Sequence, residues 1–278
     1  MYATDLLSGK RIVITGGGTG LGASMALRFA GLGAHPVLLG RRQQPLTDTA
    51  ATISAATGVP VVTRTCDVRD PLAIDRIFEE LWQEQPFDAL VNNAAATFIA
   101  QTEHLSAKAA DAVLATTMHG ALYCTLAAGK RWISAARPGV VLSILSTSTI
   151  TGRAFTVPSS MAKSAVLAMT RSLAVEWGPK NIRCVAIAPG PFPTPGASAN
   201  LMPDGLPRDT PAQRNPLGRA GDHSELANLA AFLLSDQAGY INGEMVTIDG
   251  GAHLRTSGVE DLVRWSDAQW QSLRGMRR

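Results

Sequence analysis

The sequence predicts an α/β protein built on a doubly wound parallel sheet of about seven strands, with helices on both faces. Short apolar runs rich in β-branched residues alternate with longer segments of helical spacing, which is the pattern of repeated strand–helix units. A glycine-rich turn lies directly between the first such run and the first helical segment, as in a Rossmann fold. The expected strands are 11–15, 36–39, 61–65, 89–91, 140–145, 184–187 and 245–248.

The segments between these strands are expected to be helices at 23–32, 46–57, 71–84, 107–136, 160–177 and 224–234. Two stretches break the alternation. Residues 190–216, dense in Pro, Gly and Ala, are interpreted as a lid over the substrate because they follow a strand's carboxyl end; the alternative is an ordinary surface excursion. The tail, 252–278, is expected to pack on a neighbouring chain or over the site. All of these parts belong to one expected domain, 1–278.

Composition limits the class of protein. With 278 residues, 46% hydrophobic and 17% charged, the chain has ample material for one soluble core. The net charge of +3 comes mostly from scattered arginines, so no nucleic-acid partner is expected. No run approaches the length that spans a bilayer and no signal peptide is evident, so we expect a cytoplasmic protein without a membrane partner.

The three cysteines, Cys66, Cys124 and Cys184, are odd in number, widely spaced and embedded in apolar runs. This pattern favours neither a disulfide framework nor a metal site. We expect buried thiols in a reducing compartment.

The glycine-rich run after the first strand is the first candidate site. A pyrophosphate needs a close backbone approach and free amides, which glycines and a helix start supply together. The alternative is a plain glycine-rich turn. The residues expected to hold a dinucleotide here are Thr15, Gly16, Gly17, Thr19, Gly20, Leu21 and Gly22.

At the end of the second strand stand Arg41 and Arg42, where an NAD-selective site would usually place an acidic residue. Guanidinium groups form charge-assisted hydrogen bonds to a 2′-phosphate, whereas a carboxylate there would repel it. The pair therefore favours NADPH. The alternative is a solvated basic turn.

The ends of three later strands are expected to complete the dinucleotide site. A short acceptor after the third strand can meet the adenine amino group or cap the following helix. Small alanines beside amides after the fourth strand suit a backbone lying against ribose and nicotinamide, or form a simple turn. A proline–glycine turn after the sixth strand can hold the carboxamide. The residues are Asp67 and Val68; Asn93, Ala94 and Ala95; and Pro189, Gly190, Pro191 and Thr194.

Taken together, these stretches resemble the short-chain dehydrogenase/reductase superfamily over nearly the whole chain. Its TGxxxGxG, NNAG and Pro-Gly motifs fall at 15–22, 92–95 and 189–190. Within that superfamily the chain resembles the 2,4-dienoyl-CoA reductases, through residues 92–99, 174–178 and 225–233 and the tail around Trp270.

The resemblance implies an NADPH-dependent reductase of an unsaturated acyl thioester in fatty-acid metabolism. Such enzymes deliver hydride to the far end of the conjugated system and a proton near the thioester. It also implies a homo-oligomer, with a tetramer favoured, because segments like 244–248 and 160–177 form shared interfaces in similar proteins.

The superfamily's YxxxK signature is incomplete in this chain. Lys163 is preceded four residues earlier by Ser159, and the replacement tyrosine of the mitochondrial-type dienoyl-CoA reductases, fifteen residues before the lysine, corresponds to Ser148. The superfamily's helix asparagine corresponds to Thr117, where the peroxisomal type has an aspartate that works with its lysine. The mitochondrial-type asparagine corresponds to His119.

Several residues are candidates for the chemistry that the tyrosine would perform. Lys163 is expected beneath the nicotinamide ribose, where its ammonium binds hydroxyls and supports developing negative charge. An imidazole at His119 can donate a proton directly or through water, or it is a buried structural histidine. Tyr123, one helical turn away, either faces the site or packs in the core.

The substrate side is expected to include Phe98, Ser146 and Ser148. Hydroxyls at these serines and at Ser159 can hold an enolate oxygen or a water, although a serine is too weak an acid to replace a phenol unaided. The run 146–151 can equally be a polar loop.

Three functions remain open from the sequence. The first is reduction of an enoyl or dienoyl thioester, which needs hydride placement and enolate stabilisation more than a strong acid. The second is a dinucleotide-binding homologue with little or no activity. The third, reduction of a 3-oxoacyl group or another carbonyl, is disfavoured because an alkoxide needs a good proton donor at its own oxygen.

Overall fold

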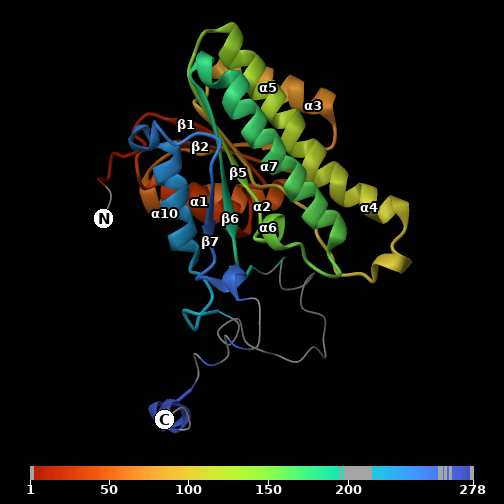
Figure 1. Ribbon diagram of the computed structural model, residues 1–278. Helices are drawn as coiled ribbons and strands as arrows, with labels where there is room; N and C mark the ends of the chain where they lie inside the picture. The colour runs from red at the N-terminus through yellow and green to blue at the C-terminus, as the bar shows by residue number, and fades with distance from the viewer. Residues whose placement is uncertain are drawn as a thin grey trace.

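The computed structural model describes residues 3–194, 196, 215–255, 259, 262 and 265–275. Its centre is a parallel sheet of seven strands in the order β3-β2-β1-β4-β5-β6-β7 (Figure 1). The strand order reverses between β1 and β4, so the predicted doubly wound sheet is confirmed. The strands are β1 (Arg11–Thr15), β2 (His35–Gly40), β3 (Val62–Thr65), β4 (Ala89–Asn92), β5 (Gly139–Ile144), β6 (Ile182–Pro189) and β7 (Met245–Ile248).

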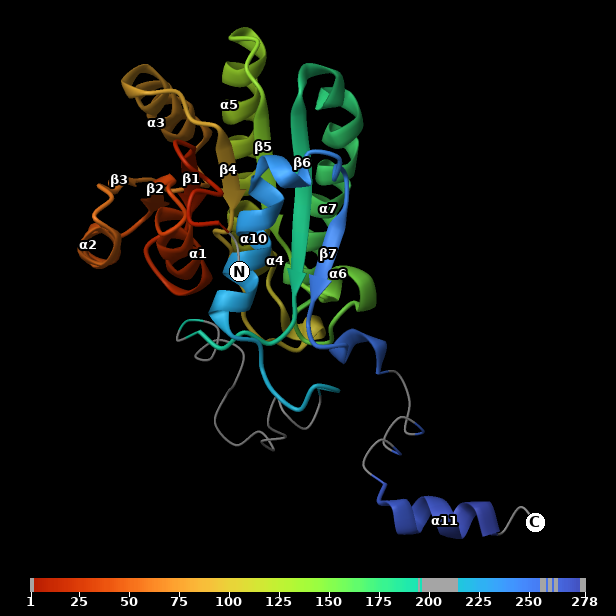
Figure 2. The same cartoon turned by 90° about the vertical axis from the view of Figure 1, so that its left-hand side faces the viewer.

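Helices cover both faces of the sheet (Figure 2). One face carries α1 (Gly20–Ala30), α2 (Gln43–Thr57) and α10 (His223–Leu234). The other carries α3 (Pro71–Glu84), α5 (Gly120–Ser134) and α7 (Val157–Trp177). The shorter helices are α4 (Ala107–Leu114), which precedes α5, and α6 (Ser148–Thr151), which follows β5.

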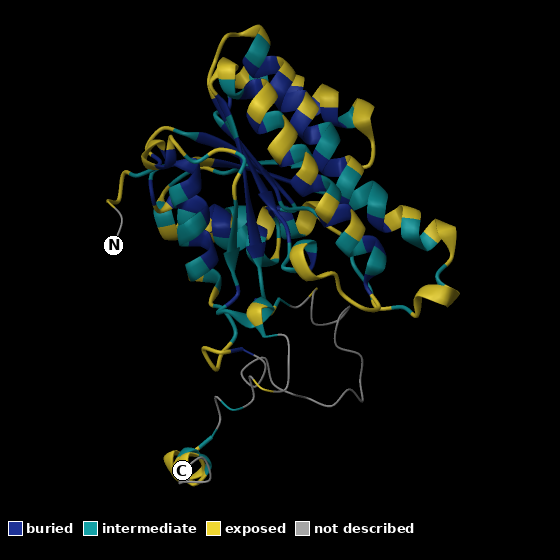
Figure 3. Ribbon diagram, in the orientation of Figure 1, coloured by how far each residue is buried: buried dark blue, intermediate teal, exposed yellow. Residues whose placement is uncertain are grey.

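The core lies in two apolar layers, one on each side of the strands. Successive strand residues point to opposite faces, so in β1 Ile12 and Ile14 pack towards α1 and α10 while Val13 packs towards α3 and α5. On the second side Phe87 contacts Phe78 and Trp132 edge-to-face. Figure 3 shows the result: the central strands are buried and the outer faces of the helices are exposed.

The helix expected at 107–136 is present, but a π-helical turn within it separates α4 from α5. Between α4 and α5 the five residues Ala115–His119 form a π-helical turn, which widens the helix at the level of the sheet's carboxyl edge. Sequence periodicity cannot show such a turn because one extra residue shifts the helix face only locally. The cap of α3 also differs from expectation: Asp70, not Asp67, accepts hydrogen bonds from the first amides of that helix.

The continuous helical stretch Ala107–Ser134 is long and apolar enough to cross a bilayer by length and composition. This corrects the expectation that no segment approaches that length. Its most apolar window is 56% buried inside the protein, where α5 packs against α3 and the sheet. Core helices of soluble proteins have the same composition, so the stretch is accounted for by the fold.

The three cysteines are buried and free, as expected. Burial raises the pKa of the Cys66 thiol to about 11 and that of Cys184 to about 12, and it raises the pKa of Cys124 further. Thiols with such pKa values hold their proton at neutral pH and are poor nucleophiles.

Two expected features concern the chain after β6 and β7. Of the expected lid, 190–216, residues 195 and 197–214 lie outside the described residues. In the tail, α11 (Asp267–Gly275) lies apart from the sheet in both views (Figures 1 and 2), with the rings of Trp265 and Trp270 5.2 Å apart. This part of the tail does not cover the cavity described below, so packing on a neighbouring chain stays the prediction for it.

Candidate active site

A cavity of about 610 Å³ opens at the carboxyl edge of the sheet, where the strand order reverses. Ligands of doubly wound folds bind at this point. Most of the predicted site residues line the cavity: Gly16, Thr19, Gly20, Leu21, Arg41, Arg42, Val68, Asn93, Ala94, Ala95, Ser146, Ser148, Ser159, Lys163, Pro189, Gly190 and Thr194. Eight do not line it: Thr15, Gly17, Gly22, Asp67, Phe98, Thr117, His119 and Pro191.

The turn between β1 and α1 forms one wall of the cavity. Thr19 is the N-cap of α1, yet its side chain makes no capping hydrogen bond to any described residue, and the first turn of the helix carries no acidic side chain. The first amides of α1 are therefore available to a ligand, at the positive end of the helix dipole. Gly20 adopts φ +54°, a conformation that favours glycine. A diphosphate fits this wall because it brings acceptors and negative charge together.

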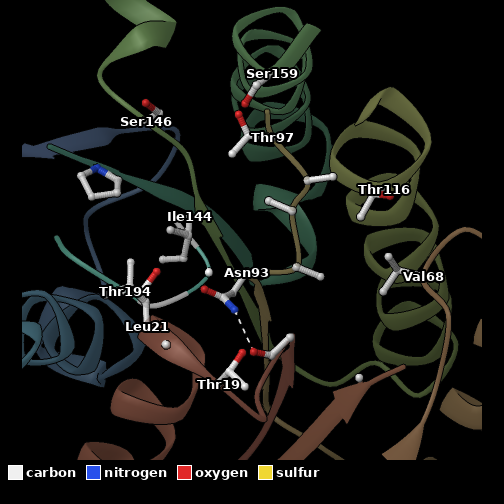
Figure 4. A pocket seen from close by; sticks show the side chains of 18 of the residues that line it. Thr19, Leu21, Val68, Asn93, Thr97, Thr116, Ile144, Ser146, Ser159 and Thr194 are labelled. Carbon is white, nitrogen blue, oxygen red and sulfur yellow. Dashed lines mark hydrogen bonds between the residues drawn. The ribbon is translucent and has the colours of Figure 1, made fainter. Parts of the chain in front are cut away.

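Thr15 and Asn93 join this turn to the segment after β4. The Thr15 hydroxyl accepts hydrogen bonds from the amides of Asn93 and Ala94, both at 3.0 Å. The Asn93 side-chain amide donates to the carbonyl of Thr15 at 2.9 Å and to that of Gly16 at 3.2 Å. Figure 4 labels Asn93 and marks one of its hydrogen bonds. Thr15 therefore holds two cavity-lining segments together from behind, which corrects its expected place against the dinucleotide.

Gly17 and Gly22 allow close packing of the same turn, and neither of them lines the cavity. A Cβ at Gly17 would lie 2.9 Å from the Leu38 side chain, and one at Gly22 would lie 2.4 Å from the Gly16 carbonyl oxygen. Real Cβ atoms do not tolerate such distances. These two glycines are needed for close packing of the turn on β2 and on itself.

The edge of the cavity beyond β2 is basic. Arg41 and Arg42 are exposed at the start of α2, and neither guanidinium hydrogen-bonds or ion-pairs with a residue that the structure describes. Asp67 is turned away: it binds Arg69, and this hydrogen bond, with a smaller contribution from the charge of Arg41, holds the pKa of the Asp67 carboxyl below its usual range. Asp67 does not line the cavity, whereas its neighbours Cys66 and Val68 do.

Lys163 lies at the opposite end, on α7 and only 8% exposed. Its ammonium donates to the carbonyl oxygen of Ile144, at the end of β5, at 2.5 Å. Burial lowers the pKa of Lys163 to about 8. One ammonium hydrogen is thus committed to the backbone, and the remaining two are available to groups in the cavity.

Hydroxyl groups surround this end of the cavity. Ser146 follows β5, Ser148 begins α6 and is buried, and Ser159 belongs to the first turns of α7 (Figure 4). The amide of Ser148 donates to the Ser146 hydroxyl at 3.3 Å, so these two serines belong to one turn.

The structure corrects the expectations for two helix residues. His119 is exposed, lies outside the cavity and stacks on Tyr123 with ring centroids 5.8 Å apart. It is therefore neither buried nor placed to donate a proton in the cavity, and Tyr123 packs against the core instead of facing the site. Thr117 is 1% exposed and uses its hydroxyl behind the cavity, where it bonds the backbone of Ala96.

Pro191 and Phe98 are the remaining corrections. Pro191 lines a separate small cavity beside Asn215 and Asp249. Phe98 is half-buried outside the main cavity, and its neighbour Thr97 lines it instead.

Sequence reasoning missed four polar residues of the cavity: Thr97, Thr116, Arg153 and Thr156. Thr97 is adjacent to the recognised NNAG-like motif, which is a signal that could have found it. The other three follow no strand directly, and only the π-turn and the loop between α6 and α7 bring them to the cavity. Among the described residues, no group of three or more His, Cys, Asp or Glu side chains is placed to hold a metal ion.

Comparisons with known proteins agree with this architecture. Residues 16–253 match a family model described as enoyl-(acyl carrier protein) reductase. The chain is 41% identical to a probable 2,4-dienoyl-CoA reductase of Bacillus subtilis, over 88% of this chain and 97% of that protein. It is 32% identical to a peroxisomal 2,4-dienoyl-CoA reductase of Mus musculus, over 95% and 91% of the two chains.

Solved structures give the same result. A short chain dehydrogenase from Bacillus anthracis is 38% identical and superposes with a TM-score of 0.80, covering 89% of this chain and 98% of that one. A putative 2-deoxy-d-gluconate 3-dehydrogenase from Agrobacterium tumefaciens with bound NADP is 32% identical, with a TM-score of 0.83 and coverage of 91% and 100%.

The fold and the cavity define a dinucleotide-binding α/β oxidoreductase. The chain belongs to the short-chain dehydrogenase/reductase superfamily, and its relatives include 2,4-dienoyl-CoA reductases.

Proposed function

We propose that this protein is an NADPH-dependent reductase of a conjugated acyl thioester, a 2,4-dienoyl-CoA reductase in fatty-acid metabolism. One observation carries the proposal: a single cavity joins an exposed arginine pair and a helix N-terminus to a cluster of hydroxyls around Lys163, with Ser159 at the position of the superfamily's tyrosine. The 2,4-dienoyl-CoA reductases among its relatives support the choice of substrate.

The cavity's residues suit NADPH. The amides at the start of α1 would hold the pyrophosphate, and Arg41 and Arg42 would hold the 2′-phosphate. Val68 would lie against the adenine and Lys163 near the nicotinamide ribose. The NADP-bound structure among the chain's neighbours supports this choice. When bound, the dinucleotide supplies the hydride.

The proposed substrate suits a site without a phenol. Hydride adds to C5 of the dienoyl group, the electron pairs shift along the conjugated chain, and negative charge arrives at the thioester oxygen. Because this oxygen is remote from the reacting carbon, the site must stabilise a dienolate more than it must protonate an alkoxide. A proton from solvent then adds to C2 or C4, so the reaction consumes one NADPH and one proton and yields an enoyl thioester and NADP⁺.

Lys163 would act on this dienolate in two ways. Its ammonium places positive charge at the hydroxyl-lined end of the cavity, and its low pKa makes it a stronger acid than an ordinary lysine. Arg153, exposed at the same end, adds a second positive charge that suits the phosphates of a coenzyme A thioester.

A substrate panel tests the proposal. NADPH oxidation, followed by absorbance, should occur with 2,4-dienoyl thioesters, more slowly with enoyl thioesters and least with 3-oxoacyl thioesters. A protein that binds NADPH but oxidises it with none of these, and whose NADPH affinity alone changes in Lys163→Ala, would be a dinucleotide-binding homologue. The serines at 148 and 159 are the observation that favours this second function.

The cofactor preference has its own test. Replacing Arg41 and Arg42 together by alanine should weaken NADPH binding by about tenfold or more and leave NADH binding nearly unchanged, since each charge-assisted bond contributes about 1.5–3 kcal/mol. The control is Arg76→Ala, which removes an exposed arginine from α3 that pairs with Glu80, one turn further along the helix. Equal affinities of the wild type for the two cofactors would overturn the preference.

A further inference from the structure

We propose that Thr97 is a further catalytic residue, which together with Ser159 forms a two-hydroxyl site for the thioester oxygen of the substrate. This inference rests on the proposed function and assigns the group that takes up the developing charge. It comes from the juxtaposition of two side chains from separate elements.

The backbone around Thr97 is fixed from both sides. On one side, the Thr117 hydroxyl contacts both polar groups of Ala96: it accepts from the amide at 3.0 Å and lies 3.4 Å from the carbonyl oxygen. On the other, the amide of Ala100 donates to the carbonyl of Phe155 at 2.9 Å. Thr97 therefore lies between two anchored points, and its side chain has a defined place on the cavity wall.

The π-turn explains why Thr117 can act as this anchor. It lies within Ala115–His119, where Thr117 is buried while its neighbour Thr116 lines the cavity. Two consecutive threonines thus serve different sides of one segment. Thr117 is a positioning residue, because it touches Ala96 and not the cavity.

Thr97 and Ser159 face each other across the cavity. Figure 4 shows their hydroxyls pointing toward one another, Thr97 from the segment after β4 and Ser159 from α7. Neither hydroxyl hydrogen-bonds a residue that the structure describes, so both can donate to a ligand oxygen placed between them.

A pair of hydroxyl donors, one from Thr97 and one from Ser159, compensates for the short reach of the serine side chain. A serine hydroxyl reaches less far than a phenol and is a much weaker acid, so Ser159 alone cannot protonate the dienolate. Stabilising an oxyanion, however, needs only hydrogen-bond donors aimed at the oxygen where charge develops. Both residues donate hydrogen bonds and form no covalent bond, and the proton that completes the reaction still comes from solvent to carbon.

The test compares Thr97→Val, which removes the hydroxyl at nearly constant shape, with Thr97→Ser, which keeps it. Thr97→Val should lower kcat for a dienoyl thioester by about tenfold to a thousandfold, the range for losing one oxyanion donor, while the Kd for NADPH stays unchanged. Thr97→Ser should restore most of kcat. Ser159→Ala should show the same loss in kcat without a change in the Kd for NADPH.

Thr52→Val is the matched control, because Thr52 is exposed on α2 and its hydroxyl donates to the carbonyl of Asp48 within that helix. A Thr97→Val protein that turns over like the wild type, or a Thr97→Ser protein as slow as Thr97→Val, overturns the inference and leaves the proposed function intact. A wild type that reduces no unsaturated thioester overturns the proposed function, and with it the inference. Melting temperatures of all variants separate these results from misfolding.

Discussion

At the scale of single residues, the proposed function requires Lys163 to stabilise more of the developing negative charge, because residue 159 is a serine and not a tyrosine. The lysine is held on the Ile144 carbonyl and desolvated, so its ammonium is less stable than that of a surface lysine. Burial disfavours the charged form, which makes the group a better proton donor and a stronger electrostatic partner for an anion in the cavity.

The Lys163 amine should therefore titrate near pH 8 in the cofactor-free protein, against 10.5 for an ordinary lysine. The folded-state pKa lies below the unfolded value, so the unfolded chain binds more protons between pH 8 and 10.5 and the stability contribution of this group rises across that window. Labelling with an amine-reactive reagent, read by mass spectrometry of the Lys163 peptide, should be half-maximal near pH 8. A midpoint near 10.5 would contradict the desolvation argument.

His119 should be dispensable. Its ring is exposed and stacks on Tyr123 outside the cavity, so His119→Asn should leave kcat within about twofold of the wild type, as for a surface substitution. The shape of the pH–rate profile should also be unchanged. Loss of one limb of that profile in the variant would show that the histidine reaches the reaction.

The sequence was sufficient to predict the place of most site residues that directly follow a strand. Three glycines of the turn after β1 and the arginine pair after β2 line the cavity: Gly16, Gly18, Gly20, Arg41 and Arg42. Prediction failed for His119 because a family position on a helix does not fix which way the side chain points, and a π-turn here changes the facing of two threonines. It missed Arg153 because no motif marks the loop after α6.

At the scale of elements, the turn between β1 and α1 has little room for added side-chain atoms. The glycines of this turn have two different surroundings. Some line the cavity, whereas Gly22, which has no Cβ, lets the first turn of α1 pack on the Gly16 carbonyl. The Asn93 amide donates to this same carbonyl. A shift in one segment is therefore expected to move the other, and the first amides of α1 with them.

Gly22→Ala should accordingly destabilise the protein by about 1–3 kcal/mol, the usual cost of overpacking, and should abolish most dinucleotide affinity. Its Cβ would lie 2.4 Å from the Gly16 oxygen and 2.7 Å from the Asn93 side-chain nitrogen. The control is Gly31→Ala at the end of the same helix, where φ is −67° and the nearest atoms lie at 3.6 Å. Chemical denaturation and NADPH titration measure both effects, and equal behaviour of the two variants would refute the packing argument.

The bounds of the strands and helices show where the hydrophobic pattern of the sequence predicts secondary structure well. The strands were predicted to within a few residues because apolar, β-branched runs between turns are strong signals in a parallel sheet whose central strands are buried. α7 begins before the expected residue 160, since Pro158 fits the first turn of a helix, where no amide donor is required.

At the scale of the whole molecule, we expect a homotetramer, on resemblance to similar proteins. The outer face of α7 is consistent with this: Met161 is 56% and Val175 is 80% exposed. Light scattering at micromolar concentration should give about four times the chain mass of 29.2 kDa. Val175→Glu should shift the mass downward, whereas Leu72→Glu, on the exposed face of α3, should not. A wild type of 29.2 kDa alone would reject the tetramer.

The order of the sheet also has a consequence for how the chain is made. β1 comes before the other strands of the sheet along the described chain, yet it lies at the centre of the finished sheet, between β2 and β4, with every residue buried. Until Asn92 has emerged, the nascent chain carries one side of this strand as an unpaired edge, which is the kind of surface that other chains can join. We infer that a chaperone able to cover this edge would protect the chain during the interval between synthesis of β1 and of β4.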